Sequence, residues 1–209
     1  MDQKLNMNSK SKDKKFPIWP LILILALWVV AVIIAPEEKS LKAGIKPVYV
    51  HVALTWMGML SLSISAILGL YGAFTKNKNL YRWIYIVFGV SVGIYILGYF
   101  SSMISSYINW GGVPFQEPRF ISTLNVIIAS ILTGGIMLLV PWDIVKSALT
   151  AFPVLFIFLT IQTDRMVLHP DSAVESAPLG IRLSFYGMFV IALLFYVWWV
   201  FYIERLTRK

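Results

Sequence analysis

Long runs of apolar residues, separated by short polar stretches, dominate the 209-residue chain. A helix that crosses a membrane needs about 20 mostly apolar residues, at a rise of about 1.5 Å each. Six runs approach or exceed that length, and we predict a membrane-spanning helix in each. The predicted spans cover residues 18–35, 47–74, 83–108, 120–140, 146–161 and 179–203. The fifth is the weakest, because it is short and contains Pro153.

The composition supports the prediction of membrane-spanning helices, since 58% of the residues are hydrophobic and 13% are charged. A soluble domain usually carries about 25% charged residues. We therefore predict an all-α, polytopic membrane protein, in which a six-helix bundle (18–203) lies between a basic arm (1–17) and a basic tail (204–209). No small-residue cleavage pattern follows the first span, so we expect that span to be retained.

The positive charges are distributed unevenly over the predicted loops. Twelve of the eighteen Lys and Arg residues fall in the arm, the tail and the two connections between them on the same side of the membrane. With the acidic residues included, that side carries a net charge of +8 and the opposite side 0. Because positively charged loops stay in the cytoplasm, we predict a multi-pass plasma-membrane protein with both termini inside. The outer loops are then 36–46, 109–119 and 162–178.

The same charge distribution indicates the partner of the basic arm. A basic segment next to a membrane span attracts anionic lipids, so we expect the arm to contact the lipid bilayer and not a nucleic acid. The spans themselves hold almost no ionisable side chains, the exceptions being His51 and Arg182 near span ends. Ion-coupled transporters and proton pumps need such groups at mid-membrane, which makes that class a poor match.

The chain contains no cysteine. This excludes a disulfide scaffold, a thiolate metal site, a thiol oxidoreductase and covalent haem attachment. Its two histidines, His51 and His169, both fall on the predicted outer side at similar depth. Each could be an interfacial histidine that bridges headgroups and hydrocarbon. Alternatively, two facing imidazoles could ligate a haem iron from above and below. Zinc fits less well, because no third ligand of the usual kind is evident.

The second outer loop, residues 109–119, adds side chains suited to a porphyrin. Trp110 and Phe115 could stack on a flat apolar ring, and Arg119 could pair with an anionic propionate. The competing interpretation is an aromatic belt at the membrane interface, which is common in membrane proteins. Composition alone favours the belt, since 15% of the residues are aromatic throughout the chain.

A resemblance to a known protein family favours the porphyrin interpretation. The start of the second predicted span resembles that of the CcmC-type haem-handling proteins of cytochrome c maturation, also called haem exporter protein C. The family pattern there runs basic, two apolar, Tyr, apolar, His, Val, and ends on Trp, and Lys46, Tyr49, His51, Val52 and Trp56 fall on it. The proline that follows the family's His-Val is an alanine here.

The second outer loop is similar to the family's tryptophan-rich segment. That segment opens on Trp-Gly and closes on Asp-x-Arg, and Trp110, Gly111, Glu117 and Arg119 match its spacing without a gap. Three of the family's tryptophans are replaced here, and its Asp is Glu117. His169 falls where the family has its second outer histidine.

The resemblance implies a haem-handling protein, not an enzyme, that binds haem b non-covalently at its outer face. His51 and His169 would ligate the iron, and Arg119 and Lys46 would meet the propionates. Trp110, Phe115 and Trp56 are the aromatic residues expected at the cofactor site. By resemblance, the partners are an ABC-type exporter and a haem chaperone that receives the haem.

Two alternatives remain open. One is a haemless structural subunit of a larger membrane complex, which the replaced tryptophans favour. The other is a cytochrome b subunit of a quinol redox complex. That second role usually needs two haems stacked across about 30 Å of membrane, whereas this chain has one histidine pair at one depth.

Overall fold

A computed structural model describes residues 16–161 and 177–208 of the chain. Within these ranges the secondary structure is helical, with no strand and one isolated bridge between Glu38 and Lys42. The prediction of an all-α protein is therefore confirmed. The helices are α1 (Trp19–Ile34), α2 (Ile45–Thr75), α3 (Lys78–Trp110), α4 (Pro118–Leu139), α5 (Asp143–Leu149), α6 (Phe152–Ile161) and α7 (Leu179–Thr207).

Four of the described helices, α2, α3, α4 and α7, are long and apolar enough to cross a membrane. Helix α1 has 16 residues. At about 1.5 Å per residue, a helix of that length is shorter than a typical span of about 30 Å. Helix α7 continues to Thr207, so the predicted boundary between bundle and tail at residue 203 falls inside this helix. The described chain forms an all-α bundle with the length and polarity that a membrane requires.

The fifth predicted span differs from the prediction, because it consists of two short helices, α5 and α6. The nitrogen of Pro153 has no hydrogen, so a continuous helix would lose the bond to the carbonyl of Leu149 and would meet a steric clash there. Proline is tolerated in the first turn of a helix, which is where α6 places it. The hydroxyl of Thr150, at the break, donates to the carbonyls of Ser147 (2.8 Å) and Ser65 (3.2 Å) and so holds the break against α2.

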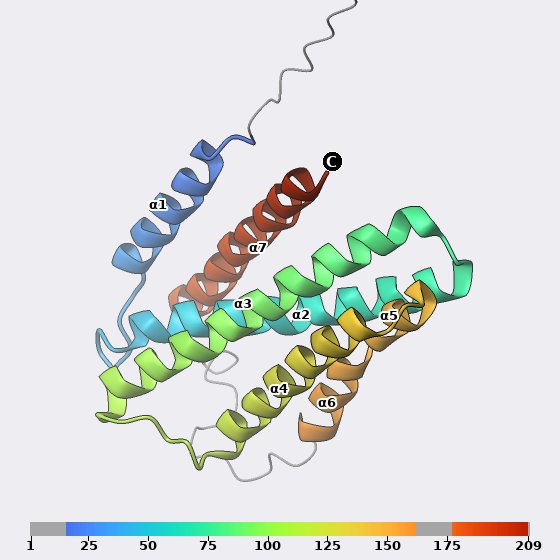
Figure 1. Cartoon of the computed structure of the whole chain (residues 1–209). Coiled ribbons are helices and arrows are strands. Elements are labelled where there is room, and N and C mark those ends of the chain that lie inside the picture. Colours follow the sequence, from blue (N-terminus) through green and yellow to red (C-terminus); the bar gives the residue numbers. More distant parts are fainter. Residues whose placement is uncertain (1–15, 162–176, 209) are drawn as a thin grey trace, which may run out of the picture.

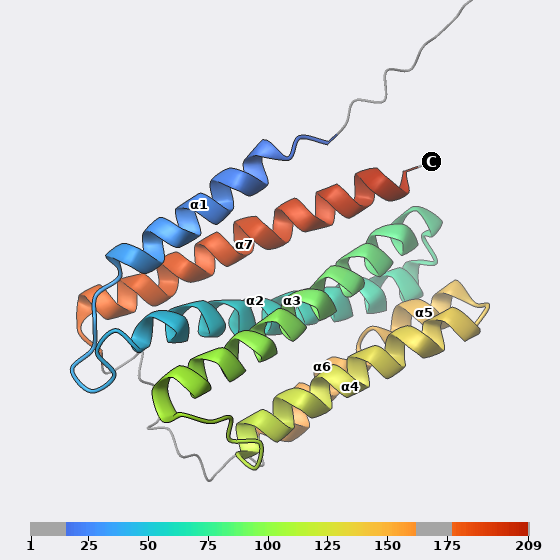
Figure 2. The same cartoon turned by 60° about the vertical axis from the view of Figure 1, so that its left-hand side comes forward.

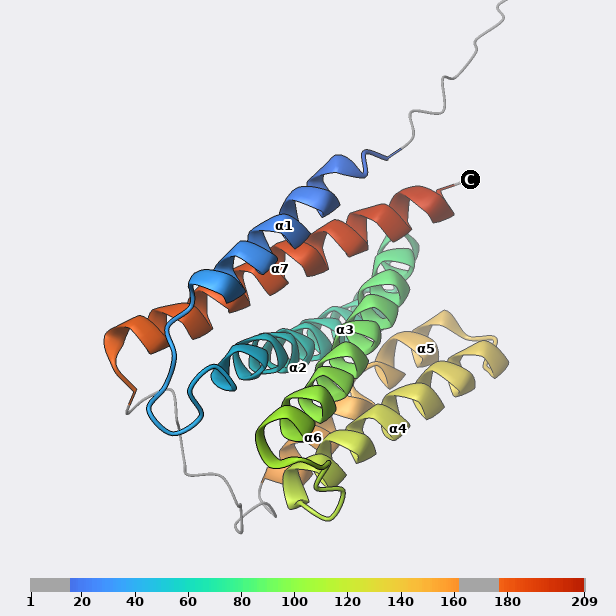
Figure 3. The ribbon, with the colours of Figure 1, turned by 90° about the vertical axis from the view of Figure 1, so that its left-hand side faces the viewer.

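Helices α2 and α3 form the antiparallel centre of the bundle, and the other helices lie on either side of this pair (Figures 1 and 2). On one side, α1 and α7 run next to each other, and α7 contacts both central helices. On the other side, α4 packs against α6, and α5 and α6 contact α2. The view in Figure 3 shows α3 crossing α2 between these two flanking pairs. The apolar core is divided in the same way into two clusters.

The bundle has two ends, which we name after one residue at each. At the His51 end, α2, α4 and α7 begin and α3 terminates (Figure 1). At the Arg82 end, α3 and α5 begin and α2 and α7 terminate. Residues 16–18, just before α1, also lie at the Arg82 end, where the ring of Phe16 packs on those of Trp198 (5.7 Å between centroids) and Tyr202 (5.9 Å).

Close contacts between α2 and α3 set their register. A Cβ on Gly58 would lie 2.7–2.9 Å from atoms of Tyr95, and one on Gly98 would lie 2.9–3.1 Å from Thr55. Only glycine allows the two backbones to approach this closely. Near the His51 end, the side-chain amide of Asn109 donates to the carbonyl of Gly44 at 2.9 Å. These contacts follow a single antiparallel register.

Candidate functional site

His51 lies in the second turn of α2 and is half-buried. It is spaced seven residues from both Gly44 and Gly58, so the three share the side of α2 that faces α3. The register defined by Gly44–Asn109 and Gly58–Tyr95 places His51 opposite Ser102. His51 therefore faces the last turns of α3 at this end of the bundle.

The segment of α3 opposite His51 is rich in serine. Ser101 and Ser102 donate their hydroxyls to α3 carbonyls, those of Gly98 (2.9 Å) and Tyr99 (2.6 Å). Ser105 is 1% exposed, and its buried Oγ has no hydrogen-bond partner among the described residues. A buried polar atom without a partner costs free energy, unless a water molecule or a ligand meets it. These three serines, Ser101, Ser102 and Ser105, which we call the serine band, form a polar zone near the end of α3.

The aromatic loop after α3 is held in place by backbone and ring contacts. Gly111 has a positive φ of 72°, which ends α3, and its N–H donates to the carbonyl of Tyr107. The ring of Phe115 packs edge-on against Phe120 (6.4 Å between centroids), which packs in turn against Tyr99 (5.5 Å). Phe115 remains 63% exposed. The loop therefore presents a large apolar side chain at the surface on a supported backbone.

Trp110, Glu117 and Arg119 lie at the same end of the bundle. Trp110 is the last residue of α3 and is 52% exposed. Glu117 is buried at the N-cap of α4, where a carboxylate interacts favourably with the helix dipole. Arg119 follows in the first turn of α4 and is exposed. The structure therefore brings the predicted residues of the second outer loop to the end that holds His51.

Lys46 and Trp56 lie on a different side of α2 from His51. Each is five residues from His51, which is about 140° around a helix of 3.6 residues per turn. The ammonium of Lys46 donates to the carbonyl of Ile33 at the end of α1 (2.9 Å). The ring of Trp56 packs on the α7 side chains of Phe185, Tyr186 and Phe189, at 6.3, 6.5 and 6.3 Å between centroids. In this structure both residues join α2 to its flanking helices.

The second predicted ligand, His169, lies outside the described residues, as does most of the loop around it. The structure therefore does not place the two imidazoles relative to each other. Within the described ranges, no group of three or more His, Cys, Asp or Glu side chains is arranged to hold a metal ion.

The loop between α1 and α2 is stabilised by Glu38. One carboxylate oxygen of Glu38 accepts hydrogen bonds from the N–H and hydroxyl of Ser40 and from the N–H of Leu41. These bonds, that of the Ser40 hydroxyl first, lower the pKa of Glu38 below its ordinary value. The hydroxyl of Tyr49 in α2 donates to the carbonyl of Pro36 (2.9 Å) and anchors the loop to the bundle.

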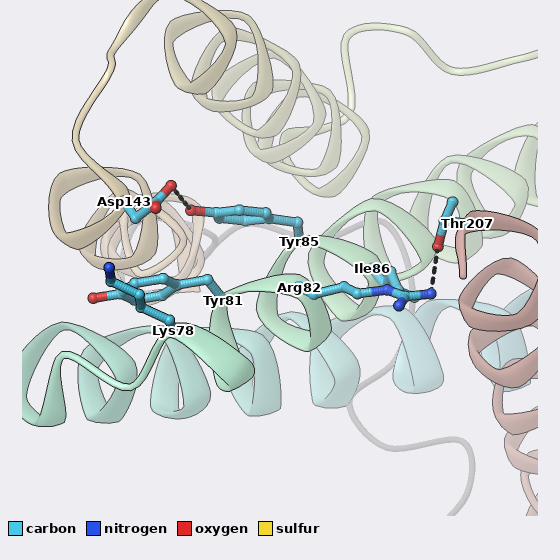
Figure 4. Close-up of a pocket in the computed structure, with 7 residues that line it drawn as sticks. All are labelled: Lys78, Tyr81, Arg82, Tyr85, Ile86, Asp143 and Thr207. Carbon is cyan, nitrogen blue, oxygen red and sulfur yellow. Dashed lines mark hydrogen bonds between the residues drawn. The ribbon is translucent and has the colours of Figure 1, made fainter. Parts of the chain in front are cut away.

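A second polar site lies at the Arg82 end and was not predicted from the sequence. It is a pocket of about 410 Å³, which we call the Arg82 pocket (Figure 4). Five residues of α3 line one wall, with Asp143 of α5 on one side and Thr207 of α7 on the other. The lining residues are Lys78, Tyr81, Arg82, Tyr85, Ile86, Asp143 and Thr207.

Hydrogen bonds and ion pairs join the three helices around this pocket. Arg82 donates through Nη2 to the carbonyl of Glu204 (2.5 Å) and to the hydroxyl of Thr207 (3.3 Å), and it pairs with the Glu204 carboxylate at 3.4 Å. The same carboxylate pairs with Arg208 at 3.2 Å. On the other side, the hydroxyl of Tyr85 donates to Asp143 at 3.0 Å.

One sequence signal could have indicated this pocket. Lys78, Tyr81, Arg82 and Tyr85 recur every three or four residues and so share one face of a helix. Their partners from α5 and α7 are distant in sequence, and only the folded chain brings them together.

In comparisons with known proteins, no family model and no curated protein matches this sequence. The resemblance to the CcmC type rests on the motif positions quoted above.

Proposed function

We propose that the protein handles haem at the His51 end, binding it non-covalently and passing it to a partner in cytochrome c assembly. The observation that carries this proposal is the gathering of His51, Trp110, Phe115 and Arg119 at one end of the bundle. These residues supply an imidazole ligand, apolar rings and a cation, which are the groups that a porphyrin with two propionates requires.

The residues present fit haem b. His51 is half-buried, which shields an axial ligand from bulk water while leaving one side accessible. The exposed rings of Trp110 and Phe115 would gain from covering an apolar macrocycle. The buried, unpartnered hydroxyl of Ser105 lies in the serine band that faces His51. Such a hydroxyl gains free energy when a polar group of a ligand or a water molecule meets it.

Each residue then has a separate task. Haem, when bound, supplies an iron that accepts imidazole nitrogens. His51 would hold it from α2, and His169 is proposed as the second ligand. Arg119 would pair with one propionate. Lys46 is a weaker candidate for the other, because its ammonium already donates to Ile33, although an ammonium has two further donors.

The proposed role is delivery and not catalysis. A protein that passes its ligand on needs a moderate affinity, so a site that is partly open at the end of a bundle suits the task. The proposed partners are a haem chaperone that receives the haem and an ABC-type exporter. Both come from the family resemblance.

The proposed orientation in the plasma membrane has the His51 end outside and both termini inside. The cysteine-free chain allows a direct test with single cysteines and a membrane-impermeant thiol reagent on intact cells. We expect Gln116→Cys to be labelled from outside and Lys78→Cys only after the membrane is permeabilised. Labelling of Lys78→Cys in intact cells would contradict this orientation.

The haem proposal is tested by the absorption spectrum of the purified protein. We expect a Soret band that shifts on reduction with dithionite, and we expect the double variant His51→Ala, His169→Ala to lack it. Equal haem in the wild type and in the double variant would overturn the assignment of ligands. If no form of the protein binds haem, the chain is a haemless relative that uses the helical frame as a partner surface.

A further inference from the structure

Asn109 lies one residue before the end of α3 and joins this helix to the start of α2. Its side-chain amide donates one hydrogen bond to the carbonyl of Gly44 and one to the carbonyl of Ser105, both at 2.9 Å. Gly44 is the N-cap of α2, and Ser105 lies one turn earlier on α3. Both hydrogens of the amide are therefore used, one on each helix.

The contact between Asn109 and Gly44 is closely fitted. Gly44 has a φ of −63°, which any residue can adopt, so its backbone conformation does not require glycine. A Cβ on Gly44, however, would meet the side-chain oxygen of Asn109 and would lie 2.9 Å from the carbonyl oxygen of Leu41. The missing side chain at Gly44 is thus what allows the amide of Asn109 to reach the start of α2.

This contact lies between residues of the proposed haem site. Trp110 directly follows Asn109, and His51 is seven residues after Gly44 on the same side of α2. Ser102, opposite His51, is eight residues before Trp110, which is about 12 Å along the helix axis. Because His51 and Trp110 are far apart in the chain, the register of α2 against α3 sets their separation.

The last turn of α3 is the part of this helix that most needs such a contact. Helix ends fray, because their final carbonyls have no partner within the helix. Trp110 is the last residue of α3, and the loop that carries Phe115 begins directly after it. Movement of this turn would therefore move both rings relative to His51.

We propose that Asn109 is a positioning residue for the haem site, which holds Trp110 and the following loop at a fixed distance and orientation from His51. Asn109 acts through these residues and touches neither iron nor porphyrin. The consequence for haem rests on the proposed function, whereas the positioning itself can be measured in haem-free protein.

The first test measures this positioning without haem. Spin labels on Leu60→Cys, an exposed position of α2, and on Gln116→Cys, in the loop after α3, report the distance between helix and loop by double electron–electron resonance. The chain has no other cysteine. Asn109→Asp keeps the shape of the side chain and removes both donors. We expect a single narrow distance distribution with Asn109 and a broad or split one in Asn109→Asp.

Thr150→Val is the matched control. The hydroxyl of Thr150 likewise donates to one carbonyl of its own helix, that of Ser147, and to one of α2, that of Ser65, but at the break between α5 and α6. This variant should lower the midpoint of thermal unfolding, as Asn109→Asp does, and leave the distance distribution narrow. Equal broadening in both variants would show a general loosening of the bundle and would overturn the proposal. A narrow distribution in Asn109→Asp would also overturn it.

Gly44→Ala reaches the same contact from α2 and keeps the proposal testable if Asn109→Asp does not fold. The added methyl group should displace the amide of Asn109 and broaden the distribution. Gly112→Ala, where nothing lies within 4 Å of a Cβ, should not. A narrow distribution in Gly44→Ala would contradict the role of Asn109.

The second test asks whether this positioning serves haem. We expect Asn109→Asp to weaken haem retention about tenfold, the low end of the loss that is typical when a residue supports a metal ligand without touching the metal. Thr150→Val should retain haem as the wild type does. If the wild type binds no haem, the haem function fails, while the distance measurement still decides the role of Asn109. Equal haem retention in the wild type and Asn109→Asp would overturn the link between Asn109 and haem.

Discussion

The two ends of the bundle differ in what their side chains contact and in how exposed they are. At the Arg82 end, side chains from three helices are joined by hydrogen bonds and ion pairs, such as those of Arg82 with Glu204 and of Tyr85 with Asp143. At the His51 end, the large rings of Trp110, at the end of α3, and of Phe115, in the loop that follows, are exposed. Both ends contain contacts that join helices, but only the His51 end also leaves these large rings exposed beside them.

The sharpest test of this difference is His51→Ala. We expect this variant to lose haem retention. Removing a residue that only hydrogen-bonds a metal ligand typically lowers affinity about 10–100-fold, and removing the ligand itself should lower it more. Haem content per protein, measured by the pyridine haemochrome spectrum, is the readout. Tyr85→Phe, at the other end, is the control and should leave haem content unchanged. A similar loss in both variants would remove the functional distinction between the ends.

The helix packing that separates the two ends is tested by Gly58→Val. The added side chain meets Tyr95, whose atoms lie 2.7–2.9 Å from the position of a Cβ. We expect a loss of about 1–3 kcal/mol in the free energy of unfolding, since α2 and α3 must move apart. Gly89→Val, where nothing lies within 4 Å of a Cβ, should cost much less. Equal destabilisation would show that the register between α2 and α3 does not depend on Gly58.

The contribution of the Arg82 end to stability, through the contacts between α3 and α7, is tested by Arg82→Gln. This change removes the charge and weakens the bonds to Glu204 and Thr207. A hydrogen bond to a charged group contributes about 1.5–3 kcal/mol, and we expect the low end of that range because the Arg82 side chain is 39% exposed. The midpoint of thermal unfolding in detergent should fall, while Arg205→Gln should leave it nearly unchanged. Haem content should not change in either variant.

Smaller effects on haem retention are expected from substitutions of Trp110 and Arg119, which lie at the same end as His51. Trp110→Ala should weaken haem retention by about three- to tenfold, since an aromatic contact contributes about 0.5–1.5 kcal/mol. Arg119→Ala should fall between Trp110→Ala and His51→Ala, because the charge-assisted contact to a propionate is partly screened by solvent. Haem dissociation to apomyoglobin measures both. A larger loss from Trp110→Ala than from His51→Ala would make ring contact, not ligation, the main source of affinity.

The smallest expected effect is the pH response of the loop that enters the His51 end. The hydrogen bonds of Ser40 and Leu41 lower the pKa of Glu38 in the folded state. Glu38 therefore stabilises the fold above the unfolded pKa of about 4.3, and this contribution is lost as the pH falls through the lower folded pKa. We expect Glu38→Gln to lower the unfolding midpoint slightly at pH 7 and not at pH 3. Glu37→Gln is the control, and an identical pH response in both variants would contradict the role of Glu38.

The length and polarity of the apolar runs were enough to predict the all-α membrane bundle. A chain inside hydrocarbon must satisfy its backbone hydrogen bonds internally, and helices do so within a single segment. The break in the fifth predicted span also had a visible cause in Pro153, although the sequence did not show that Thr150 would hold the break against α2. For the candidate site, the sequence predicted Trp110, Phe115 and Arg119 on the same side of the membrane as His51, and in the structure all four lie at one end of the bundle.

The neighbours of each helix were decided only by tertiary packing. Nothing in the periodicity of α2 showed that His51 would face the serine band of α3 while Trp56 and Lys46 would face α7 and α1. The Arg82 pocket could not be predicted from the sequence either. Its contacts join residues that are far apart in the chain, Arg82 with Glu204 and Tyr85 with Asp143. In a bundle whose helices are apolar on nearly every side, many pairings bury similar surface. Close-packed glycines and a few polar contacts between distant segments select one of them.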